Sequence, residues 1–203
     1  MRMLRKGVVV SLSLSAFLFM LPFELMQGVI KRLSGRGRGT RLVSEVYAEV
    51  FCQVDEALQI LLPTAKDIKE EIKTLTEEQK KTVAQKAKIE WDAENDRQYP
   101  FYVSSTGIAV INTVKGKWGP ITFMMAFDKE GKIKDLIVLE LKERRGRPVK
   151  DRRFLDQFMG KSAADPIKLN KDIKGIAGAT ISSRQMSDGI RKLVHIYELF
   201  YKQ

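Results

Sequence analysis

The stretch ITFMMAFDKEGKIKDLIVLEL, residues 121–141, decides the fold. Large apolar side chains occupy every second position from Ile121 to Phe127, which is the period of a strand with one face in a core. Residues 128–131, Asp-Lys-Glu-Gly, form a turn sequence, and residues 133–141 return as a second strand that is apolar on both faces. The stretch therefore predicts an antiparallel hairpin with at least one buried central strand.

Two further strands are predicted on the N-terminal side of this hairpin. Residues 99–105 and 108–114 alternate with the same period around Thr106-Gly107. Together with the hairpin they predict an antiparallel meander of at least four strands, because short connections join neighbouring antiparallel strands.

Helices are predicted on both sides of the meander. Thr76 followed three residues later by Gln79 is a capping box, which opens a helix. The expected helices cover residues 54–62, 76–93, 152–159 and 183–201. This order predicts an α+β fold in one domain, residues 44–203, with a helical lead-in (44–98) and a core (99–203).

The N-terminus has a different character. Residues 8–23, VVVSLSLSAFLFMLPF, are apolar on all sides, and Glu24 is the only charge between Lys6 and Lys31. Such a segment is typical of an export signal or a membrane anchor and is long enough to cross a hydrocarbon core of about 30 Å. We therefore expect an N-terminal hydrophobic helix with membrane contact through residues 7–30, and residues 1–43 as this segment plus a basic linker.

The net charge of +11 is concentrated in two places. Residues 1–44 hold eight basic residues and one acidic residue, and residues 143–153 hold six basic and two acidic residues. The rest of the chain is neutral. A nucleic-acid-binding domain normally spreads its basic residues along a whole face, so we expect no nucleic-acid partner.

The residue types also limit the chemistry. One Cys and one His exclude an internal disulfide framework and a four-ligand Cys/His zinc site within the chain. We expect no metal ligands and no catalytic side chains. His195 and the tryptophans Trp91 and Trp118 are interpreted as packing or surface residues, although a tryptophan can also stack on an aromatic ligand. Cys52 lacks a preceding lipobox.

The segment GIAGATISSR, residues 175–184, carries the clearest chemical pattern. Gly178 and Ala179 allow a ligand to approach the backbone closely, and Thr180, Ser182 and Ser183 offer hydroxyl groups just before a predicted helix. Hydroxyls and the N–H groups of a helix N-terminus favour a phosphate. The alternative interpretation is an ordinary capped loop.

This segment resembles the flavinylation motif of FMN-binding domains, such as those of the G subunit of the Rnf complex and the C subunit of the Na⁺-pumping NADH:quinone oxidoreductase. The resemblance rests on Gly178 to Ser183. It extends to Gly119-Pro-Ile121, to Glu143-Arg-Arg-Gly146, which is similar to the E-x-x-G loop beside the flavin, and to Phe154–Ser162, which is similar to F-L-x-Q-F-x-G-K-S. Together these motifs cover residues 99–192.

The resemblance implies FMN as cofactor, attached to Thr180 by a phosphoester that a separate magnesium-dependent flavin transferase makes. The implied cofactor-binding residues are Gly178, Ala179, Thr180, Ile181, Ser182, Ser183, Glu143, Arg144, Arg145 and Gly146. Ala177 stands where the family usually has Ser or Thr, and Lys174 where it usually has Asp. Noncovalent FMN in the same loop therefore stays as an alternative.

The function that the resemblance implies is electron transfer in a membrane-associated redox chain, with membrane or periplasmic redox partners. A flavin reductase-like enzyme or an FMN-based redox sensor is the alternative. The resemblance places the domain on the outer side of the cytoplasmic membrane, anchored or periplasmic after signal cleavage. The charges flanking the apolar segment, five basic residues after it and three before it, favour the cytoplasm instead.

Overall fold

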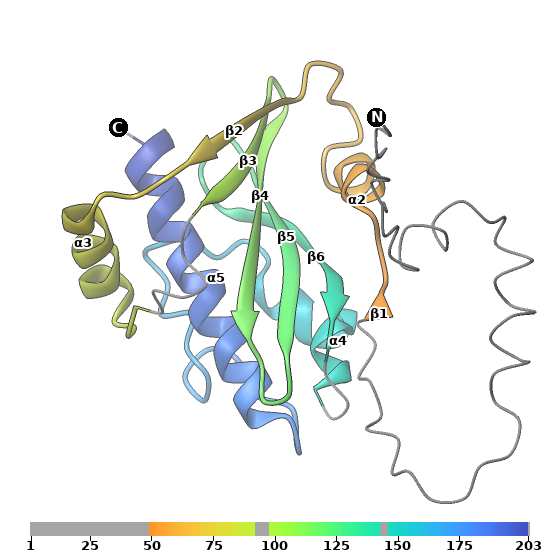
Figure 1. Ribbon diagram of the computed structural model, residues 1–203, viewed down its shortest axis with the longest axis vertical. Helices are drawn as coiled ribbons and strands as arrows, with labels where there is room; N and C mark the ends of the chain where they lie inside the picture. Colours follow the sequence, from red (N-terminus) through yellow and green to blue (C-terminus); the bar gives the residue numbers. More distant parts are fainter. Residues whose placement is uncertain (1–48, 92–97, 143–145, 203) are drawn as a thin grey trace, which may run out of the picture. The chain divides into compact units, whose positions relative to one another are not determined.

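A computed structural model describes residues 49–91, 98–142 and 146–202, which belong to one compact unit. Among these residues, six strands form a single antiparallel sheet in the order β1-β6-β5-β4-β3-β2 (Figure 1). The strands are β1 (Glu49–Val50), β2 (Lys69–Lys73), β3 (Tyr99–Ser104), β4 (Gly107–Lys115), β5 (Pro120–Phe127) and β6 (Ile133–Leu141). The α+β prediction and the antiparallel meander are confirmed.

The helical elements lie on both faces of the sheet. They are α2 (Val54–Leu61), α3 (Glu77–Ala87), η2 (Arg147–Lys150), α4 (Arg152–Leu155), η3 (Asp156–Phe158) and α5 (Thr180–Tyr201). The long helix α5 packs on β4 and α3, whereas α2 packs on β5 and β6. The helices flanking the sheet thus bury it on two sides, which requires strands that are apolar on both faces.

Strand β5 shows how its sequence meets this requirement. Phe123 and Met125 contribute to the cluster that contains the buried residues of α5, and Met124 contributes to the cluster that contains those of α2. All three side chains are fully buried. Because successive side chains of a strand point to opposite faces, the unbroken apolar run of β5 fills both clusters.

The capping box at Thr76 is present. The N–H of Gln79 donates to the Thr76 hydroxyl at 3.2 Å, and the N–H of Thr76 donates to the Gln79 side-chain oxygen at 2.9 Å. The predicted extension of this helix to residue 93 is wrong, because α3 ends at Ala87 and Lys88 adopts a left-handed conformation with φ +52°. In that conformation the Lys88 N–H donates hydrogen bonds to backbone carbonyls of the last turn, and the helix ends there.

The lead-in, expected to be helical, also supplies two strands. β1 and β2 form the two edges of the sheet, and β2 reads Lys-Glu-Glu-Ile-Lys without apolar alternation. Edge strands bury little and commonly carry charged side chains, so their sequence contains no strand period.

Two helix boundaries also differ from the predictions. The helix predicted at residues 152–159 consists of α4 followed by the 3₁₀ turn η3, and α5 begins at Thr180 rather than at Ser183. The hydrophobic segment and linker predicted at residues 1–43 lie outside the described residues. Within the described ranges, no helix is both long and apolar enough to cross a membrane.

Candidate functional site

A pocket of about 180 Å³ lies where three segments meet at one end of the sheet. These segments are the β4–β5 hairpin, the loop after β6 and the first turn of α5 (Figure 1, bottom). Its lining residues are Lys117, Gly146, Gly178, Ala179, Thr180, Ile181 and Ser182. The structure thus brings six of the ten predicted site residues together. Glu143, Arg144 and Arg145 lie outside the described residues, and Ser183 does not line the pocket.

The N-terminus of α5 opens into this pocket without a side-chain cap. Ala179 occupies the N-cap position, where it cannot accept a hydrogen bond, and the first turn carries no acidic residue. The first backbone bond of the helix runs from Ser183 N–H to the Ala179 carbonyl at 2.9 Å. The preceding N–H groups are therefore left for a ligand, at the positive end of the helix dipole.

Gly178 and Thr180 shape the approach to these N–H groups. Gly178 has φ +78°, a conformation that L-residues rarely adopt, and a Cβ there would meet no atom within 4 Å. Thr180 is exposed, and its hydroxyl makes no hydrogen bond with a described residue. The Thr180 hydroxyl is thus accessible from the pocket, and the loop leaves space beside it.

Ser183 has a different role from the one its motif position implies. Its side chain is fully buried, and its oxygen accepts a hydrogen bond from the backbone N–H of Ile176 at 3.2 Å. Ser183 thereby ties the attachment loop back to the first turn of α5. This hydrogen bond could not be predicted from the sequence, because a serine in the first turn of a helix can face either a ligand or the loop before it.

Lys117 is a pocket residue that the motifs do not contain. It lies in the β4–β5 hairpin, closed by a bond from Gly116 N–H to the Gly119 carbonyl at 2.9 Å. A Cβ on Gly119 would lie 2.6 Å from both Cβ and the carbonyl oxygen of Lys142, so the hairpin packs tightly against the end of β6. This packing fixes Lys117 beside the pocket. The basic hairpin sequence KGKWGP, residues 115–120, was the available signal.

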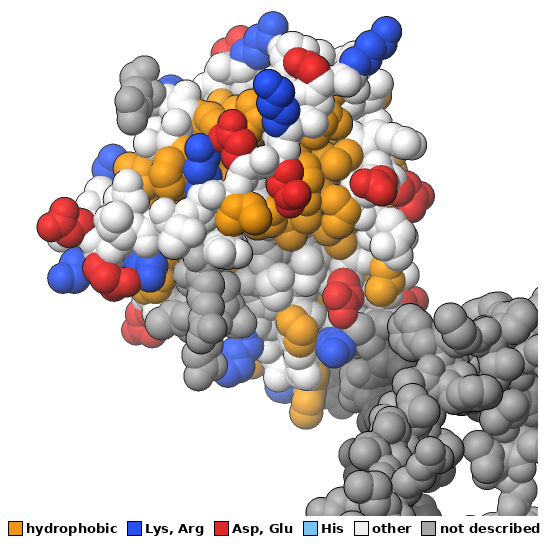
Figure 2. Space-filling model, turned by 45° about the horizontal axis from the view of Figure 1, so that its top comes forward, with side chains coloured by type: hydrophobic (Ala, Val, Ile, Leu, Met, Phe, Trp, Pro, Cys, Tyr) orange, Lys and Arg blue, Asp and Glu red, His pale blue; other side chains and the backbone are white. Residues whose placement is uncertain are grey.

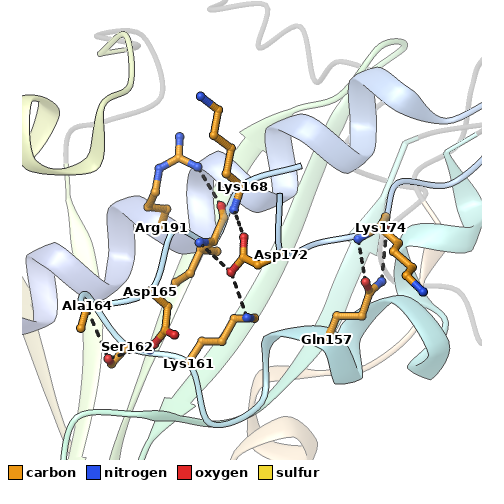
Figure 3. Close-up of polar contacts among 10 residues, drawn as sticks. Gln157, Lys161, Ser162, Ala164, Asp165, Lys168, Asp172, Lys174 and Arg191 are labelled. Atoms are coloured by element: carbon orange, nitrogen blue, oxygen red, sulfur yellow. Dashed lines mark hydrogen bonds and ion pairs between the residues drawn. The ribbon is translucent and has the colours of Figure 1, made fainter. Parts of the chain in front are cut away.

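Asp172 organises the loop that leads to the attachment segment. Its carboxylate accepts hydrogen bonds from Lys161 Nζ at 2.9 Å, Ile167 N–H at 3.1 Å and Lys168 N–H at 2.7 Å (Figure 3). Burial alone raises the pKa of Asp172, but the bonds from Lys168, Lys161 and Ile167 outweigh it, so the pKa is lowered. This acid is engaged in holding the loop and is not available as a base for Thr180.

The loop is fixed at a second point by Gln157. The Lys174 N–H donates to the Gln157 side-chain oxygen at 2.7 Å, and the Gln157 side-chain amide donates to the Lys174 carbonyl at 3.2 Å (Figure 3). Gln157 therefore holds the backbone of Lys174, the position where the family usually has Asp. Gln157 and Ser183 together position the segment between Lys174 and Thr180.

The remaining candidates are packed residues. His195 lies within α5, its side chain is 10% exposed, and burial lowers its pKa. Cys52 is buried beside α2, and burial raises the pKa of its thiol, which disfavours the reactive thiolate. Trp91 lies against Lys192, whose Nζ is 5.2 Å from the ring centroid. A packing or surface position was the expectation for His195, Trp91 and Trp118, and Trp118 is the surface residue of the three, with 60% of its area exposed.

Comparison of the sequence with known protein families shows what the part of the chain around this pocket resembles. Residues 116–195 match the family model of the FMN-binding domain. This part of the chain, 80 of the 203 residues, is similar to FMN-binding domains. The match runs from the β4–β5 hairpin into α5 and includes every residue that lines the pocket. FMN is the cofactor that the domain indicates. No curated protein matches the chain.

The residues of the pocket fit one end of FMN. Hydroxyls, uncapped N–H groups and the Lys117 ammonium are the donors that a phosphate needs, and none of the described residues that line the pocket carries a carboxylate. The volume of about 180 Å³ lies below the roughly 300–1,000 Å³ of pockets that enclose a whole ligand. A pocket of this size is suited to part of the cofactor, and its donor groups suit the phosphate.

Proposed function

We propose that this protein is an electron-transfer flavoprotein whose FMN is joined to Thr180 by a phosphoester. The observation that carries the proposal is the placement of Thr180. Its exposed hydroxyl stands at the uncapped start of α5, in a pocket with Lys117 and no carboxylate, within an FMN-binding domain. A phosphate bound there lies against the helix N-terminus, which favours negative charge.

The chain's own residues would hold and tune the cofactor. Lys117 and the first-turn N–H groups of α5 would bind the phosphate, and Gly178 would keep the approach open. The resemblance places Glu143, Arg144 and Arg145 beside the isoalloxazine, where cationic side chains raise the reduction potential of a flavin. FMN itself supplies one- and two-electron transfer. Arg145→Glu should accordingly lower the midpoint potential.

A carrier needs a donor and an acceptor, and we place both in a membrane-associated redox chain. Support comes from the apolar segment at residues 8–23 and from the resemblance to flavinylated domains on the outer side of the cytoplasmic membrane. A flavin transferase would be the maturation partner. The sequence holds no nicotinamide-binding glycine fingerprint, so a soluble nicotinamide is not the expected direct donor.

Noncovalent FMN in a reductase-like enzyme or a sensor is the second candidate. Ala177 and Lys174, which depart from the family motif, favour it, because the acid usually found before the acceptor is replaced by Lys174. Steady-state turnover of the purified protein with small soluble donors distinguishes the candidates. A carrier is reduced once and stops, a reductase turns over repeatedly, and a sensor changes its partner binding without turnover.

Intact mass spectrometry tests the covalent site. The protein is coexpressed with a flavin transferase as wild type, Thr180→Ala and Thr180→Ser. We expect a mass increase of one FMN less water in the wild type and its loss in Thr180→Ala. Thr180→Ser keeps the hydroxyl and serves as the matched control for the fold of the loop.

The alternatives give different results in the same experiment. FMN that is released on denaturation, without a mass increase, establishes the noncovalent mode. A mass increase that persists in Thr180→Ala places the bond on another residue. Absence of flavin from the wild type refutes the proposed function as a whole.

A further inference from the structure

The rim of the pocket is cationic. Two segments that contribute to the pocket, residues 114–121 and 174–184, contain Lys115, Lys117, Lys174 and Arg184 and no acidic residue, and Lys117 lines the pocket itself. All four side chains are exposed. Within the described part of the chain, none of the four forms an ion pair. These four side chains therefore present positive charge that no ion pair with a described residue compensates.

Two large apolar side chains stand among these cations. Trp118 is 60% exposed and directly follows Lys117, and Ile181 is 48% exposed and lines the pocket. Arg184 lies one helical turn beyond Ile181 and Thr180, so it points to the same side of α5. Exposed tryptophan and isoleucine among lysines and arginines are typical of a surface that enters a lipid headgroup layer.

The other end of the domain has a different surface. Figure 2, in which the top of the Figure 1 view is turned forward by 45°, shows acidic and basic side chains together around a patch of apolar side chains. A second pocket of about 550 Å³, between α2 and strands β2 and β3, includes Asp55 and Glu70 in its lining. Carboxylates there would repel anionic lipids, whereas residues 114–121 and 174–184 at the FMN pocket contain no acidic residue.

The direction of the chain adds an independent observation. Strand β1 lies antiparallel to β6 with Glu49 opposite Leu141, and Leu141 is opposite Ile121 at the start of β5. Arg147, next to Gly146 of the pocket, pairs with Glu49. The chain that precedes Glu49, which the sequence predicts to hold a membrane segment, thus joins the sheet at the same end as the pocket.

We propose that this end of the domain docks on an anionic lipid surface. Lys115, Lys174 and Arg184 contact headgroup phosphates, and Trp118 and Ile181 enter the interfacial layer. The attraction follows from charge complementarity, because anionic lipids concentrate juxtamembrane cations at the surface. The consequence is that the FMN pocket opens toward the bilayer, so its redox partner lies in or at the membrane. The docking needs no FMN and stands independently of the proposed function.

Depth-dependent fluorescence quenching tests this docking on the full chain. Trp91→Phe leaves Trp118 as the single tryptophan, since the sequence contains two. The apoprotein is reconstituted into vesicles of phosphatidylcholine with or without phosphatidylglycerol, whose acyl chains are brominated. We expect brominated lipid to quench Trp118 in phosphatidylglycerol vesicles at least twofold more than in pure phosphatidylcholine, and added salt to reverse the difference.

Charge reversal supplies the matched comparison. Lys115→Glu/Arg184→Glu should abolish the phosphatidylglycerol-dependent quenching. Lys129→Glu/Lys132→Glu changes the net charge equally on the exposed β5–β6 turn, away from the pocket, and should leave the quenching intact. Intact mass of the same variants after coexpression with a flavin transferase reports separately whether FMN attachment is unaffected.

Three results would overturn the docking. If Trp118 is quenched equally in both lipid mixtures, the domain does not dock specifically on anionic lipid. If quenching is lost in both double variants, membrane binding depends on the net charge of the protein and not on this surface. Quenching of Trp118 by FMN in the flavin-loaded protein, with no quenching by lipid in the apoprotein, assigns this side chain to the cofactor and leaves an acidic redox protein as the partner of the cations.

Discussion

Asp172→Asn is the substitution that most directly tests how the attachment loop is held. The carboxylate accepts three hydrogen bonds, from the Lys161 ammonium and from the N–H groups of Ile167 and Lys168. An asparagine has one accepting oxygen and an amide that donates, so at least one of the three donors would face another donor. The substitution also removes the ion pair with Lys161 while changing the volume little.

The expected loss can be worked out from these contacts. A hydrogen bond to a charged group contributes about 1.5–3 kcal/mol, and the Asp172 and Lys161 side chains are each 19% exposed, so solvent screens the pair only in part. We expect the free energy of unfolding to fall by about 2 kcal/mol at pH 7. For a domain of this size, that corresponds to a decrease in Tm of roughly 4–8 °C.

The effect of Asp172→Asn on stability should depend on pH. The pKa of Asp172 is lowered in the folded protein, and the ordinary value in an unfolded chain is about 3.9. Its stabilisation is therefore fully present above this value and is lost as the pH falls through the folded pKa. The difference between wild type and Asp172→Asn should accordingly be constant from pH 7 to about 5 and shrink below about 4.

Urea denaturation followed by circular dichroism at several pH values measures both effects. Asp156→Asn is the matched control, because Asp156 pairs only with Arg152 and is 57% exposed, so its loss should cost less than about 1 kcal/mol. A loss below about 0.5 kcal/mol for Asp172→Asn would refute the structural role of the carboxylate. A difference that persists unchanged at pH 3 would refute the assigned pKa direction.

Two further substitutions probe the hairpin and the helix. Gly119→Ala places a Cβ 2.6 Å from the Lys142 carbonyl oxygen. We therefore expect the free energy of unfolding, measured by urea denaturation, to fall by about 1–3 kcal/mol, and FMN retention to weaken. An unchanged denaturation midpoint would contradict the tight packing. Burial lowers the pKa of His195, although the charge of Glu198 opposes the shift, so the free energy of unfolding should fall as the pH drops through about 6.5. In His195→Gln, this part of the pH dependence of the free energy of unfolding should be absent.

The central strands were predictable because their own side chains define them. Residues 133–141 match β6 at both ends, and the turn at Gly131 has the φ of +78° that a glycine permits. In contrast, β2 is a strand only because β3 lies beside it, with Ile72 opposite Pro100. Its charged sequence contains no signal for that pairing, since the hydrogen bonds that make an edge strand come from its neighbour.

The site followed a similar division. Gly178 to Ser182 form a continuous segment, so a motif could identify them, and the structure places them in one pocket. Lys117 and Gln157 reach the same region from other parts of the chain, through a hairpin and a 3₁₀ turn. Their roles depend on tertiary packing that no local pattern encodes.

The size of the pocket bears on why a covalent bond would be useful here. A cavity of about 180 Å³ encloses only part of a ligand, so a cofactor held by its phosphate alone exposes most of its apolar area to water and gains little from burial. A phosphoester to Thr180 makes retention independent of that burial. It also permits a shallow site, and a shallow site is what an electron carrier needs if partners are to approach the flavin closely. The cationic, tryptophan-bearing rim fits the same logic, because orientation toward the partner then comes from the surface around the pocket and not from an enclosing cavity.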